Sequence, residues 1–496
     1  MLTAPTHDHL PAIIHALLGD KKLRPLQEDV LSLIRTGSNT LAVFGTGQGK
    51  SVCFHIPAFE NALKDGSKTI IFYPLRSLAN DQYEMLKKTA ELLDVRLFRA
   101  NGSITQKERD LLDTALADGS WDILIATPEF AQHHTDRLGQ DYNKAKLIVL
   151  DEAHHLLESR HRGAYRRFAE TLKKLGSPQT AAFTATARKE TFDHIKETLN
   201  IDSWVINPTM RENLHIVDAR NTKNKDAYIL KLAREANGKT IVYCNSRKVT
   251  AQIAEDLRQN GIKGVACYNA EMPNKQRREV EDQFRRGELH FMIATSAFGE
   301  GIDLPDVRNI ILYHLNFDMV SFNQMSGRAG RDGDISRIHL LYGEKDRAIN
   351  DYIMQKACPS ISMLRLIYKE MKKRFQGEEI RGTYAEFERQ IHNRDIDAAS
   401  ISMALKIFSD VGLAHVEKDT ESRGVIVNLL TPPEDVDITD SERFEEGQAT
   451  LEAFNQFCKH ALTEKASNLQ IAISKPIYPK DIPLKGGEAN NKILDW

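Results

Sequence analysis

The sequence lacks the features of several specialised classes of protein. Its five cysteines form no Cys-x-x-Cys pair, which argues against a disulfide framework or a cysteine zinc site. No apolar run approaches the roughly 18 residues that suggest a membrane span. The first residues also lack the basic and apolar segments of a signal peptide. We therefore expect a cytoplasmic chain with reduced thiols, no zinc and no membrane partner.

An excess of charge of either sign is also missing. The 67 Lys and Arg residues nearly balance the 69 Asp and Glu residues, so the net charge is −2. No global positive field attracts a polyanion, and any nucleic-acid site must be local. With 41% hydrophobic and 27% charged residues over 496 positions, the chain is expected to be globular with roughly three domains.

Two series of short apolar runs, rich in β-branched residues, alternate with helical stretches. The first series lies at residues 40–44, 69–73, 123–126, 147–150 and 181–184, and the second at 240–243, 291–295, 307–313 and 338–342. Buried parallel strands have this pattern. The sequence therefore predicts two α/β lobes, at 1–207 and 226–345, joined by a polar hinge at 208–225.

The pattern changes beyond residue 345. Helices are expected at 361–376, 383–391 and 397–410, followed by short strands at 413–417 and 425–430. Helices followed by a two-stranded ribbon predict a winged helix within the segment 346–432. A last helix is expected at 441–462 with Asp440 or Ser441 as its N-cap, and residues 473–496 read as a linker or extended tail. This helix and tail form the segment 433–496.

The strongest chemical signal follows the first predicted strand, where residues 44–51 read Phe-Gly-Thr-Gly-Gln-Gly-Lys-Ser. Glycines let backbone N–H groups face phosphate oxygens, and the helix that follows adds its dipole. Lys50 can reach the β- and γ-phosphates, and Ser51 can bind Mg²⁺. A strict P-loop has glycine where Phe44 stands, so the glycine set is shifted.

A second predicted strand ends in Asp151-Glu152-Ala153-His154. Two carboxylates at the end of a buried strand can divide two tasks in phosphoryl transfer. Asp151 is the candidate for holding Mg²⁺ through water, and Glu152 is the candidate base for the attacking water. An isolated Asp-Glu pair is more often a helix cap, but its combination with Lys50 and Ser51 favours an ATP site.

Three segments resemble motifs II, III and VI of superfamily 2 helicases, in the right order. They are Asp-Glu-Ala-His at 151–154, Thr-Ala-Thr at 184–186 and Gln-Met-Ser-Gly-Arg-Ala-Gly-Arg at 324–331. The segments 23–27, 50–58 and 297–303 narrow the resemblance to RecQ-like DNA helicases, over roughly residues 23–342. This resemblance implies an α/β fold of two RecA-like parallel-sheet lobes, followed by a mainly helical C-terminal region.

The resemblance also implies roles for individual residues at the ATP site. Arginine fingers at Arg328 and Arg331 would reach the γ-phosphate from the second lobe, which is worth on the order of 10³ to 10⁵ in rate. The implied catalytic residues are Lys50, Asp151, Glu152, Gln324, Arg328 and Arg331. The implied ATP-binding residues are Arg24, Gln27, Thr46, Gly47, Gln48, Gly49, Lys50, Ser51, Gly301 and Asp303, with Ser51 and Asp151 as Mg²⁺ ligands.

In such helicases the nucleic acid crosses the loops of both lobes. The candidate contacts are Pro74, Arg76, Asn80, Thr127, Glu129, Arg160, Arg162, Ser246, Arg247 and Thr295. Hydroxyls, amides and arginines suit phosphate contact without base reading. The residues expected to couple the ATP site to this track are His154, Thr184 and Thr186. Taken singly, each of the candidate contacts is more often an ordinary cap or surface residue.

Two departures from the RecQ pattern bear on function. The family carries an aromatic-rich loop after motif II, but residues 155–165 contain no Trp and a single Tyr. Arg160 and Arg162 could replace stacking by phosphate contact, and a solvated loop is about equally expected. The family's cysteine zinc module follows the second lobe, yet only Cys358 lies there. The tip of the predicted ribbon, residues 418–424, could contact a duplex or serve a structural role.

These observations favour an ATP- and Mg²⁺-dependent DNA helicase. Movement in the 3′-to-5′ direction rests on the resemblance alone. The implied partners are single-stranded and tailed or forked DNA, together with other DNA-repair proteins, in a bacterial cytoplasm or nucleoid. Residues 437–477 also resemble, more weakly, the helicase half fused to RecJ-type exonucleases, which points to repair or recombination. An RNA helicase and a nucleotide-gated clamp without processive unwinding remain alternatives.

Overall fold

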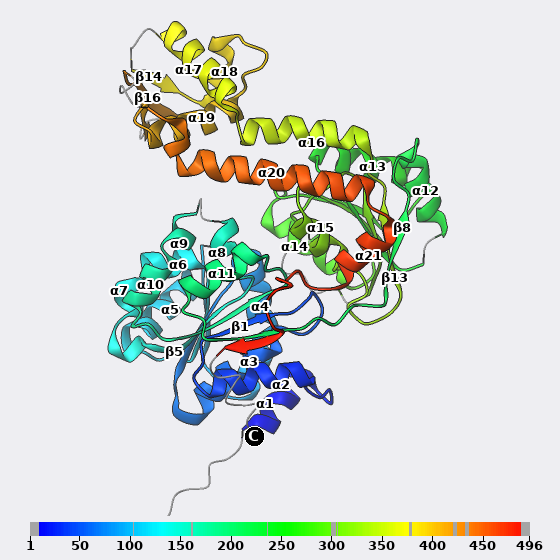
Figure 1. Ribbon diagram of the computed structural model, residues 1–496. Coiled ribbons are helices and arrows are strands. Elements are labelled where there is room, and N and C mark those ends of the chain that lie inside the picture. The colour runs from blue at the N-terminus through cyan, green and yellow to red at the C-terminus, as the bar shows by residue number, and fades with distance from the viewer. Residues whose placement is uncertain are drawn as a thin grey trace, which may run out of the picture.

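The computed structural model describes residues 9–487, except 103, 160–161, 236, 299–303, 305, 376–378, 420–423 and 432–435. Two α/β lobes lie next to each other, and a smaller module stands apart from them at the end of two helices (Figure 1). No helix within the described ranges is both long and apolar enough to cross a membrane.

The first lobe is built on an eight-stranded sheet in the order β17-β7-β1-β6-β5-β2-β4-β3. Every pair is parallel except β17 with β7. Its strands are β1 (Thr40–Val43), β2 (Lys68–Phe72), β3 (Leu97–Ala100), β4 (Ile123–Ala126), β5 (Ala145–Leu150), β6 (Gln179–Thr184), β7 (Ser203–Ile206) and β17 (Lys485–Gly487). The five strands predicted in this lobe are confirmed to within two residues at each end.

Successive side chains of these strands point to opposite faces of the sheet, and both faces are buried. Leu41 and Ile70 belong to one apolar core, and their neighbours Ala42 and Ile71 belong to the other. One face is covered by α1 (Leu10–Leu18), α2 (Pro25–Arg35), α3 (Val52–Asp65) and α4 (Arg76–Leu92). The other is covered by α5 (Gln106–Asp118), α6 (Pro128–His133), α7 (Thr135–Leu138), α8 (His155–Glu158), α9 (Gly163–Arg166), α10 (Phe168–Lys174) and α11 (Lys189–Thr198).

The second lobe is an all-parallel sheet in the order β10-β11-β9-β12-β13-β8. Its strands are β8 (Leu214–Asp218), β9 (Lys239–Tyr243), β10 (Val265–Tyr268), β11 (Phe291–Ala294), β12 (Val307–Leu312) and β13 (Ser336–Leu340). One face is covered by α12 (Lys225–Glu235) and α13 (Arg247–Gln259). The other packs on α14 (Asn274–Arg285), α15 (Met319–Ser326), α16 (Glu344–Ala357), α20 (Glu442–Thr463) and α21 (Ala466–Ser474).

The predicted hinge at 208–225 is wrong for its central part. Residues 214–218 form β8, which pairs in parallel with β13 at the edge of the second sheet. Only Leu214 of this strand is fully buried, and His215 and Asp218 are exposed. An edge strand with so few buried side chains has the composition of a polar linker, and its apolar pattern is therefore weak.

The C-terminal module contains the three helices and the ribbon that the sequence predicted. Its elements are α17 (Ile361–Phe375), β14 (Ile380–Gly382), α18 (Tyr384–Ile391), α19 (Ala398–Asp410), β15 (Ala414–Lys418) and β16 (Val425–Leu429). The sheet is antiparallel with the order β14-β16-β15, so it has one strand more than expected. The winged helix stays a prediction. Helices α16 and α20 run side by side between this module and the second sheet (Figure 1).

Helix α20 begins as predicted. Its N-cap is Ser441, whose hydroxyl accepts from the backbone N–H of Phe444, and this bond satisfies one of the open donors of the first turn. Phe454, Phe457 and Cys458 of this helix are buried in the core of the second lobe. The C-terminal region is thus part of the packing of that lobe.

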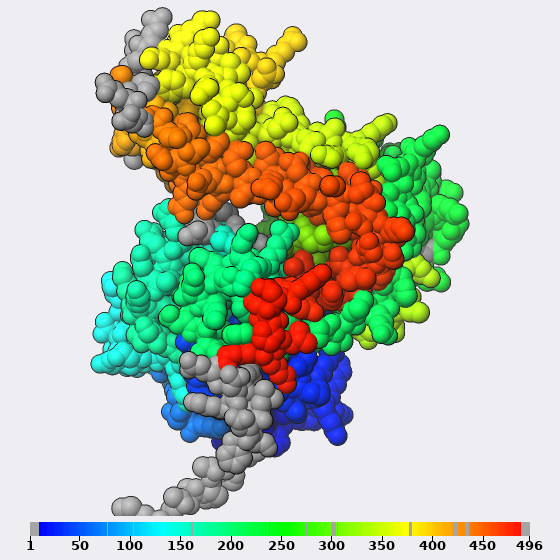
Figure 2. Space-filling model, in the orientation of Figure 1, coloured from blue at the N-terminus to red at the C-terminus, as the bar shows by residue number. Residues whose placement is uncertain are grey.

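The expectation of a linker or tail after residue 473 is wrong for the described residues. Residues 475–487, here called the C-terminal strap, leave α21 and cross to the first lobe, where Tyr478 and Ile482 pack against the core. Strand β17 at the end of the strap extends the first sheet beside β7. The red segment in Figure 2 lies over the boundary between the lobes.

Gly486→Ala is expected to destabilise the protein by about 1–3 kcal/mol, because it overpacks the junction between β17 and β7. A Cβ atom at this position would lie 2.2 Å from Cζ2 of Trp204. Thermal unfolding combined with tryptophan fluorescence measures this effect. Gly447→Ala in α20 is the control, since its Cβ would lie at an ordinary 3.6 Å from Cβ of Cys358. Wild-type stability of Gly486→Ala would argue against the pairing of β17 with β7.

Candidate ATP site and nucleic-acid track

The phosphate-binding loop connects β1 to α3, as the sequence predicted. Gly47 and Gly49 adopt φ angles of +73° and +79°, a left-handed region that favours glycine. A Cβ on Gly49 would lie 2.5 Å from Nε2 of Gln27. Glycine is therefore required at residue 49 both for the backbone turn and for the approach of Gln27.

Arg24, the N-cap of α2, and Gln27 in its first turn are two of the residues expected to bind ATP, and both contact this loop. The guanidinium of Arg24 donates to the carbonyl of Gln48 at 3.2 Å, and the amide of Gln27 donates to the carbonyl of Gly49 at 3.1 Å. The Gln48 side chain accepts from the N–H of Gly45 and donates to the carbonyl of Thr209. The loop is thus held in shape from α2 and from the segment that follows β7.

Lys50, Asp151 and Glu152 lie together at the ends of neighbouring elements. Nζ of Lys50 is 3.0 Å from Oε1 of Glu152, and Oδ1 of Asp151 accepts from the backbone N–H of Glu152. Glu152 has φ +50°, which is uncommon for a residue with a side chain and is often found at functional sites.

The electrostatics of the two carboxylates differ. Burial raises the pKa of Asp151 to about 7, and the negative charge of Glu152 adds to the increase. Burial also acts to raise the pKa of Glu152, but the nearby Lys50 ammonium outweighs it and lowers this pKa. Two adjacent acids whose pKa values are pushed apart are typical of sites where one group must remain an ionised base.

The oxygen donors at this site fit Mg²⁺, which prefers hard oxygen ligands. Ser51 stands at the N-cap of α3, yet its hydroxyl does not cap the helix. The carboxylate of Asp151 is buried and accepts one backbone hydrogen bond. These two residues could hold the ion.

Motif VI of the second lobe lies against the phosphate-binding loop. The hydroxyl of Thr46 donates to the carbonyl of Gly327 at 3.3 Å. Cγ of Arg331 lies 3.5 Å from the position of a Cβ on Gly47. The Nε atoms of Arg328 and Arg331 are both buried. The structure therefore brings Arg331 and the backbone that precedes Arg328 to the phosphate-binding loop.

The three residues predicted to couple the sites form one connected group. Nδ1 of the buried His154 lies 2.9 Å from the hydroxyl of Thr184, which itself donates to the carbonyl of Thr186. Nε2 of His154 lies 3.5 Å from Nε2 of Gln324. Motifs II, III and VI are thus joined by side chains, and burial lowers the pKa of His154 to about 3, so this histidine is neutral.

Three residues of the predicted nucleic-acid track contact one another. The guanidinium of Arg162 donates to Oε1 of Glu129 at 2.5 Å and to the carbonyl of Pro74 at 3.0 Å. It also stacks on Tyr165, 4.8 Å from the ring centroid. Arg162 therefore ties the loop after motif II to two neighbouring loops, and this ion pair competes with phosphate contact.

The other predicted track residues occupy more ordinary positions. Arg76 is exposed and lies beside Gly102, Asn80 accepts from Asn101, and Thr127 is the N-cap of α6. The hydroxyl of Ser246 caps α13, and Arg247 forms an ion pair with Glu271. Thr295 directly follows β11 and donates its N–H to the carbonyl of Tyr268. Arg160, Gly301 and Asp303 lie outside the described residues.

Asp81 on α4 was not identified from the sequence. Charged residues on α14 of the other lobe affect the pKa of its carboxyl group. Burial raises its pKa from 3.8 to about 7; Glu281 adds to the increase and Arg285 opposes it. A carboxyl with a raised folded-state pKa stabilises the fold below its unfolded pKa, and this contribution is lost as the pH rises through the folded pKa.

Asp81→Asn is therefore expected to be more stable than wild type at pH 8 and to lose part of the pH dependence between about pH 4 and 7. The difference should be of the order of 1–3 kcal/mol between pH 5 and 8. Thermal unfolding at both pH values measures it, with the exposed Asp136→Asn as control. A pH dependence identical to wild type in Asp81→Asn would assign the effect to another group.

Two family models match the chain. The DEAD/DEAH box helicase domain matches residues 24–195, and the helicase conserved C-terminal domain matches residues 224–333. The matches contain the phosphate-binding loop, motif II and motif VI, and together they cover more than half of the chain. The fold and the site therefore define a two-lobed helicase of the DEAD/DEAH box class.

The curated relatives narrow this class. The chain is 29% identical over 378 residues to the probable ATP-dependent DNA helicase RecS of Bacillus subtilis, covering 75% of this chain and 74% of RecS. It is 31% identical over 349 residues to the ATP-dependent DNA helicase RecQ of the same organism, covering 68% of this chain and 57% of RecQ. The chain is therefore a helicase with both conserved helicase domains, and it is similar to ATP-dependent DNA helicases of the RecQ and RecS type.

Some relatives extend well beyond the match. The bifunctional 3′-5′ exonuclease/ATP-dependent helicase WRN of Mus musculus is 34% identical over 349 residues, which are 66% of this chain and 24% of WRN. The chain therefore spans less than two thirds of RecQ and about a quarter of WRN.

Solved helicase structures share the fold. Dbp5 of S. cerevisiae, bound to RNA and ADP BeF3, has a TM-score of 0.58 at 20% identity, over 71% of this chain and 91% of Dbp5. The helicase MrfA bound to DNA has a TM-score of 0.57 at 19% identity, over 87% of this chain and 64% of MrfA. These likenesses establish the two RecA-like lobes.

Proposed function

We propose that this protein hydrolyses Mg-ATP to move 3′-to-5′ along single-stranded DNA and to unwind tailed or forked duplexes in DNA repair or recombination. The observation that carries the proposal is the meeting of Lys50, Glu152 and motif VI at one phosphate-binding loop. ATP hydrolysis needs a base, a cation that binds the phosphates and arginines from the second lobe. Glu152, Lys50 and the arginines of motif VI are the candidates for these three roles.

Each residue has a task that its position supports. Lys50 exchanges its ion pair with Glu152 for the β- and γ-phosphates, which leaves Glu152 to accept a proton from the attacking water. Arg328 and Arg331 approach the γ-phosphate when the lobes close, so hydrolysis depends on closure. Ser51 and Asp151 would hold Mg²⁺, which would supply positive charge to the phosphate oxygens. His154, Thr184 and Gln324 connect this site to the loops that would bind the strand.

Unwinding explains why hydrolysis must be coupled to movement. Opening one base-pair step requires a free energy of roughly 1.4 kcal/mol. Five steps therefore require about 7 kcal/mol, which is a factor of about 10⁵ in the equilibrium constant for opening. Contacts made through hydroxyls, amides and arginines suit a strand held without base reading.

A second candidate function is a nucleotide-gated clamp that binds DNA without processive unwinding. The pairing of Arg162 with Glu129 and Pro74 favours it. In this arrangement the guanidinium of the loop after motif II binds protein groups instead of a phosphate of the strand. An RNA helicase is the third reading, since phosphate contacts alone do not separate the two nucleic acids.

The deciding experiment compares ATP hydrolysis alone, with single-stranded DNA and with single-stranded RNA, and then unwinding of 3′-tailed and 5′-tailed duplexes. DNA-stimulated hydrolysis with unwinding of the 3′-tailed duplex supports the proposal. Unwinding of the 5′-tailed duplex alone contradicts the direction, and stimulation by RNA alone favours the RNA helicase. Nucleotide-dependent DNA binding without stimulated hydrolysis favours the clamp. The bacterial cytoplasm and the protein partners stay predictions.

A further inference from the structure

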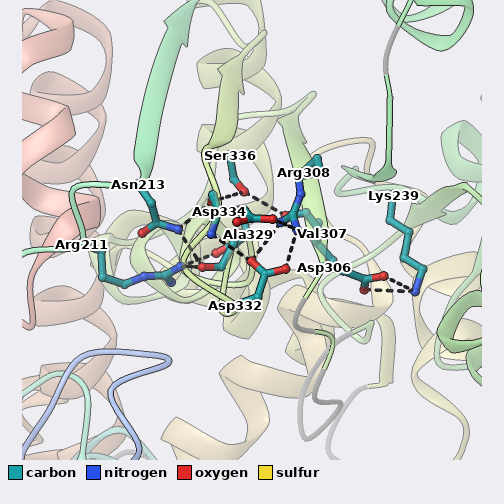
Figure 3. A network of polar contacts seen from close by, with 11 residues as sticks. Arg211, Asn213, Lys239, Asp306, Val307, Arg308, Ala329, Asp332, Asp334 and Ser336 are labelled. Atoms are coloured by element: carbon teal, nitrogen blue, oxygen red, sulfur yellow. Dashed lines mark hydrogen bonds and ion pairs between the residues drawn. The ribbon is translucent and has the colours of Figure 1, made fainter.

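Arg211 lies in the segment between β7 and β8, and its side chain reaches the loop that carries the motif VI arginines. Nη1 donates to the carbonyl of Gly327 at 2.8 Å, and Nη2 donates to the carbonyls of Ala329 and Gly330 at 2.5 and 2.6 Å. Figure 3 shows the Arg211 side chain pointing at the backbone next to Ala329. One guanidinium thus fixes three of the peptide groups that flank Arg328 and Arg331.

The same guanidinium lies beside the phosphate-binding loop. Its Nη1 and Cζ atoms lie 3.7 and 3.8 Å from the position of a Cβ on Gly47. The carbonyl of Gly327 accepts from both Arg211 and the hydroxyl of Thr46. Arg211 therefore lies where the loop of motif VI meets the loop expected to bind the triphosphate.

The backbone of Arg211 is held in place as well. Its N–H donates to the carbonyl of Ser474 at 2.7 Å, at the end of α21. Two residues later, Nδ2 of Asn213 donates to the carbonyls of Gly330 and Asp334. On the far side of the motif VI loop, Arg308 forms ion pairs with Asp332 and Asp334 (Figure 3). The loop is thus fixed from two sides, and Arg211 supplies the contact nearest the ATP site.

The chemical setting of Arg211 is unusual for a cation. Among the described residues no carboxylate forms an ion pair with it, and its guanidinium donates to the backbone carbonyls of Gly327, Ala329 and Gly330. Burial lowers its pKa to about 10, and the nearby Arg331 adds to the decrease. Asp332 opposes this decrease without forming an ion pair with Arg211, and a bound triphosphate would supply further compensating negative charge.

We infer that Arg211 is a positioning residue for ATP hydrolysis, which holds the motif VI loop so that Arg328 and Arg331 face the γ-phosphate. This inference rests on the proposed function, because it assumes that those arginines act in hydrolysis. The planar fork of arginine reaches several carbonyls at once, and the single ammonium of lysine does not. The role is therefore specific to the guanidinium.

The test measures kcat and KM for DNA-stimulated ATP hydrolysis by the full chain. Arg211→Ala should lower kcat by about 10- to 100-fold, since a small misplacement of a catalytic group has an effect of this size. KM for ATP should change by less than about threefold, because ground-state binding is retained. Arg211→Lys should recover part of kcat.

A double-mutant cycle with Arg331→Ala separates positioning from a general loss of structure. If Arg211 acts through Arg331, then adding Arg211→Ala to Arg331→Ala should lower kcat by less than about threefold more. Arg220→Ala is the matched control: Arg220 follows β8 and also donates to backbone carbonyls, which belong to Ala461 and Leu462 of α20 and not to motif VI. Its kcat should equal that of wild type.

The outcomes distinguish this inference from the proposed function. A wild-type kcat in Arg331→Ala would overturn the assumption that motif VI acts in hydrolysis. A loss in Arg331→Ala that is absent in Arg211→Ala, or losses that multiply fully in the double variant, would overturn the positioning role alone. If Arg211→Ala fails to fold, Arg211→Lys and Arg211→Gln decide: a wild-type kcat in both overturns the inference, and graded losses at unchanged KM support it.

Discussion

Glu152→Gln is expected to lower DNA-stimulated ATP turnover by about 10²- to 10⁴-fold, the usual contribution of a general base. Glutamine keeps the shape of the side chain and an oxygen that can accept from Lys50, whose Nζ lies 3.0 Å from Oε1 of Glu152. It removes the negative charge that accepts a proton from water. The variant should therefore bind nucleotide as wild type does while its turnover nearly stops.

Steady-state hydrolysis and equilibrium binding of a non-hydrolysable ATP analogue measure these two properties separately. Glu170→Gln on the exposed face of α10 is the matched control and should leave both unchanged. Turnover by Glu152→Gln at the wild-type rate would remove this residue from the role of base. Loss of nucleotide binding would instead indicate that the charge of Glu152 shapes the phosphate-binding loop.

Arg331→Ala is expected to have an effect at least as large, a loss of about 10³- to 10⁵-fold in kcat, which is the measured range for arginine fingers. The side chain lies beside Gly47, with its Cγ 3.5 Å from where a Cβ would stand. Charge on the γ-phosphate oxygens grows in the transition state, and a guanidinium delivered from the second lobe stabilises it there. Affinity for ATP should change much less than kcat.

The measurement is kcat at saturating ATP and single-stranded DNA for Arg331→Ala, Arg331→Lys and the exposed Arg337→Ala. Lysine keeps the charge but loses the planar fork, so only a partial recovery is expected. Arg337→Ala, six residues further along the chain, should behave as wild type. An equal loss in Arg337→Ala would indicate a general disturbance of the second lobe.

The candidate ATP site could be predicted from the sequence because it consists of side chains whose types and spacing are recognisable there. A glycine-rich turn before Lys50 and two acids after a buried strand leave a local signal, and the structure brings those segments together. Functional roles at these positions remain predictions. The parallel strands were recognisable for a similar reason, since strands buried on both faces form continuous apolar runs.

The parts that escaped prediction depend on the main chain. Arg211 donates to backbone carbonyls, and a carbonyl gives its partner no sequence signature. The strap escaped prediction likewise: strand β17 consists of Lys485, Gly486 and Gly487, and a strand with two glycines carries no apolar alternation. Such contacts can be found only once distant segments are placed in space.

The strap also has a consequence for how the chain folds as it is made. Within the described residues, strand β7 has β1 on one side and β17 on the other. The indole of Trp204 on β7 donates to the carbonyl of Pro483, 279 residues further along the chain. During synthesis the first lobe emerges early, but this edge stays open until the strap arrives. An open edge can pair with a strand of another chain. Nascent chains on one messenger are therefore exposed to mutual aggregation through β7 until the antiparallel partner docks.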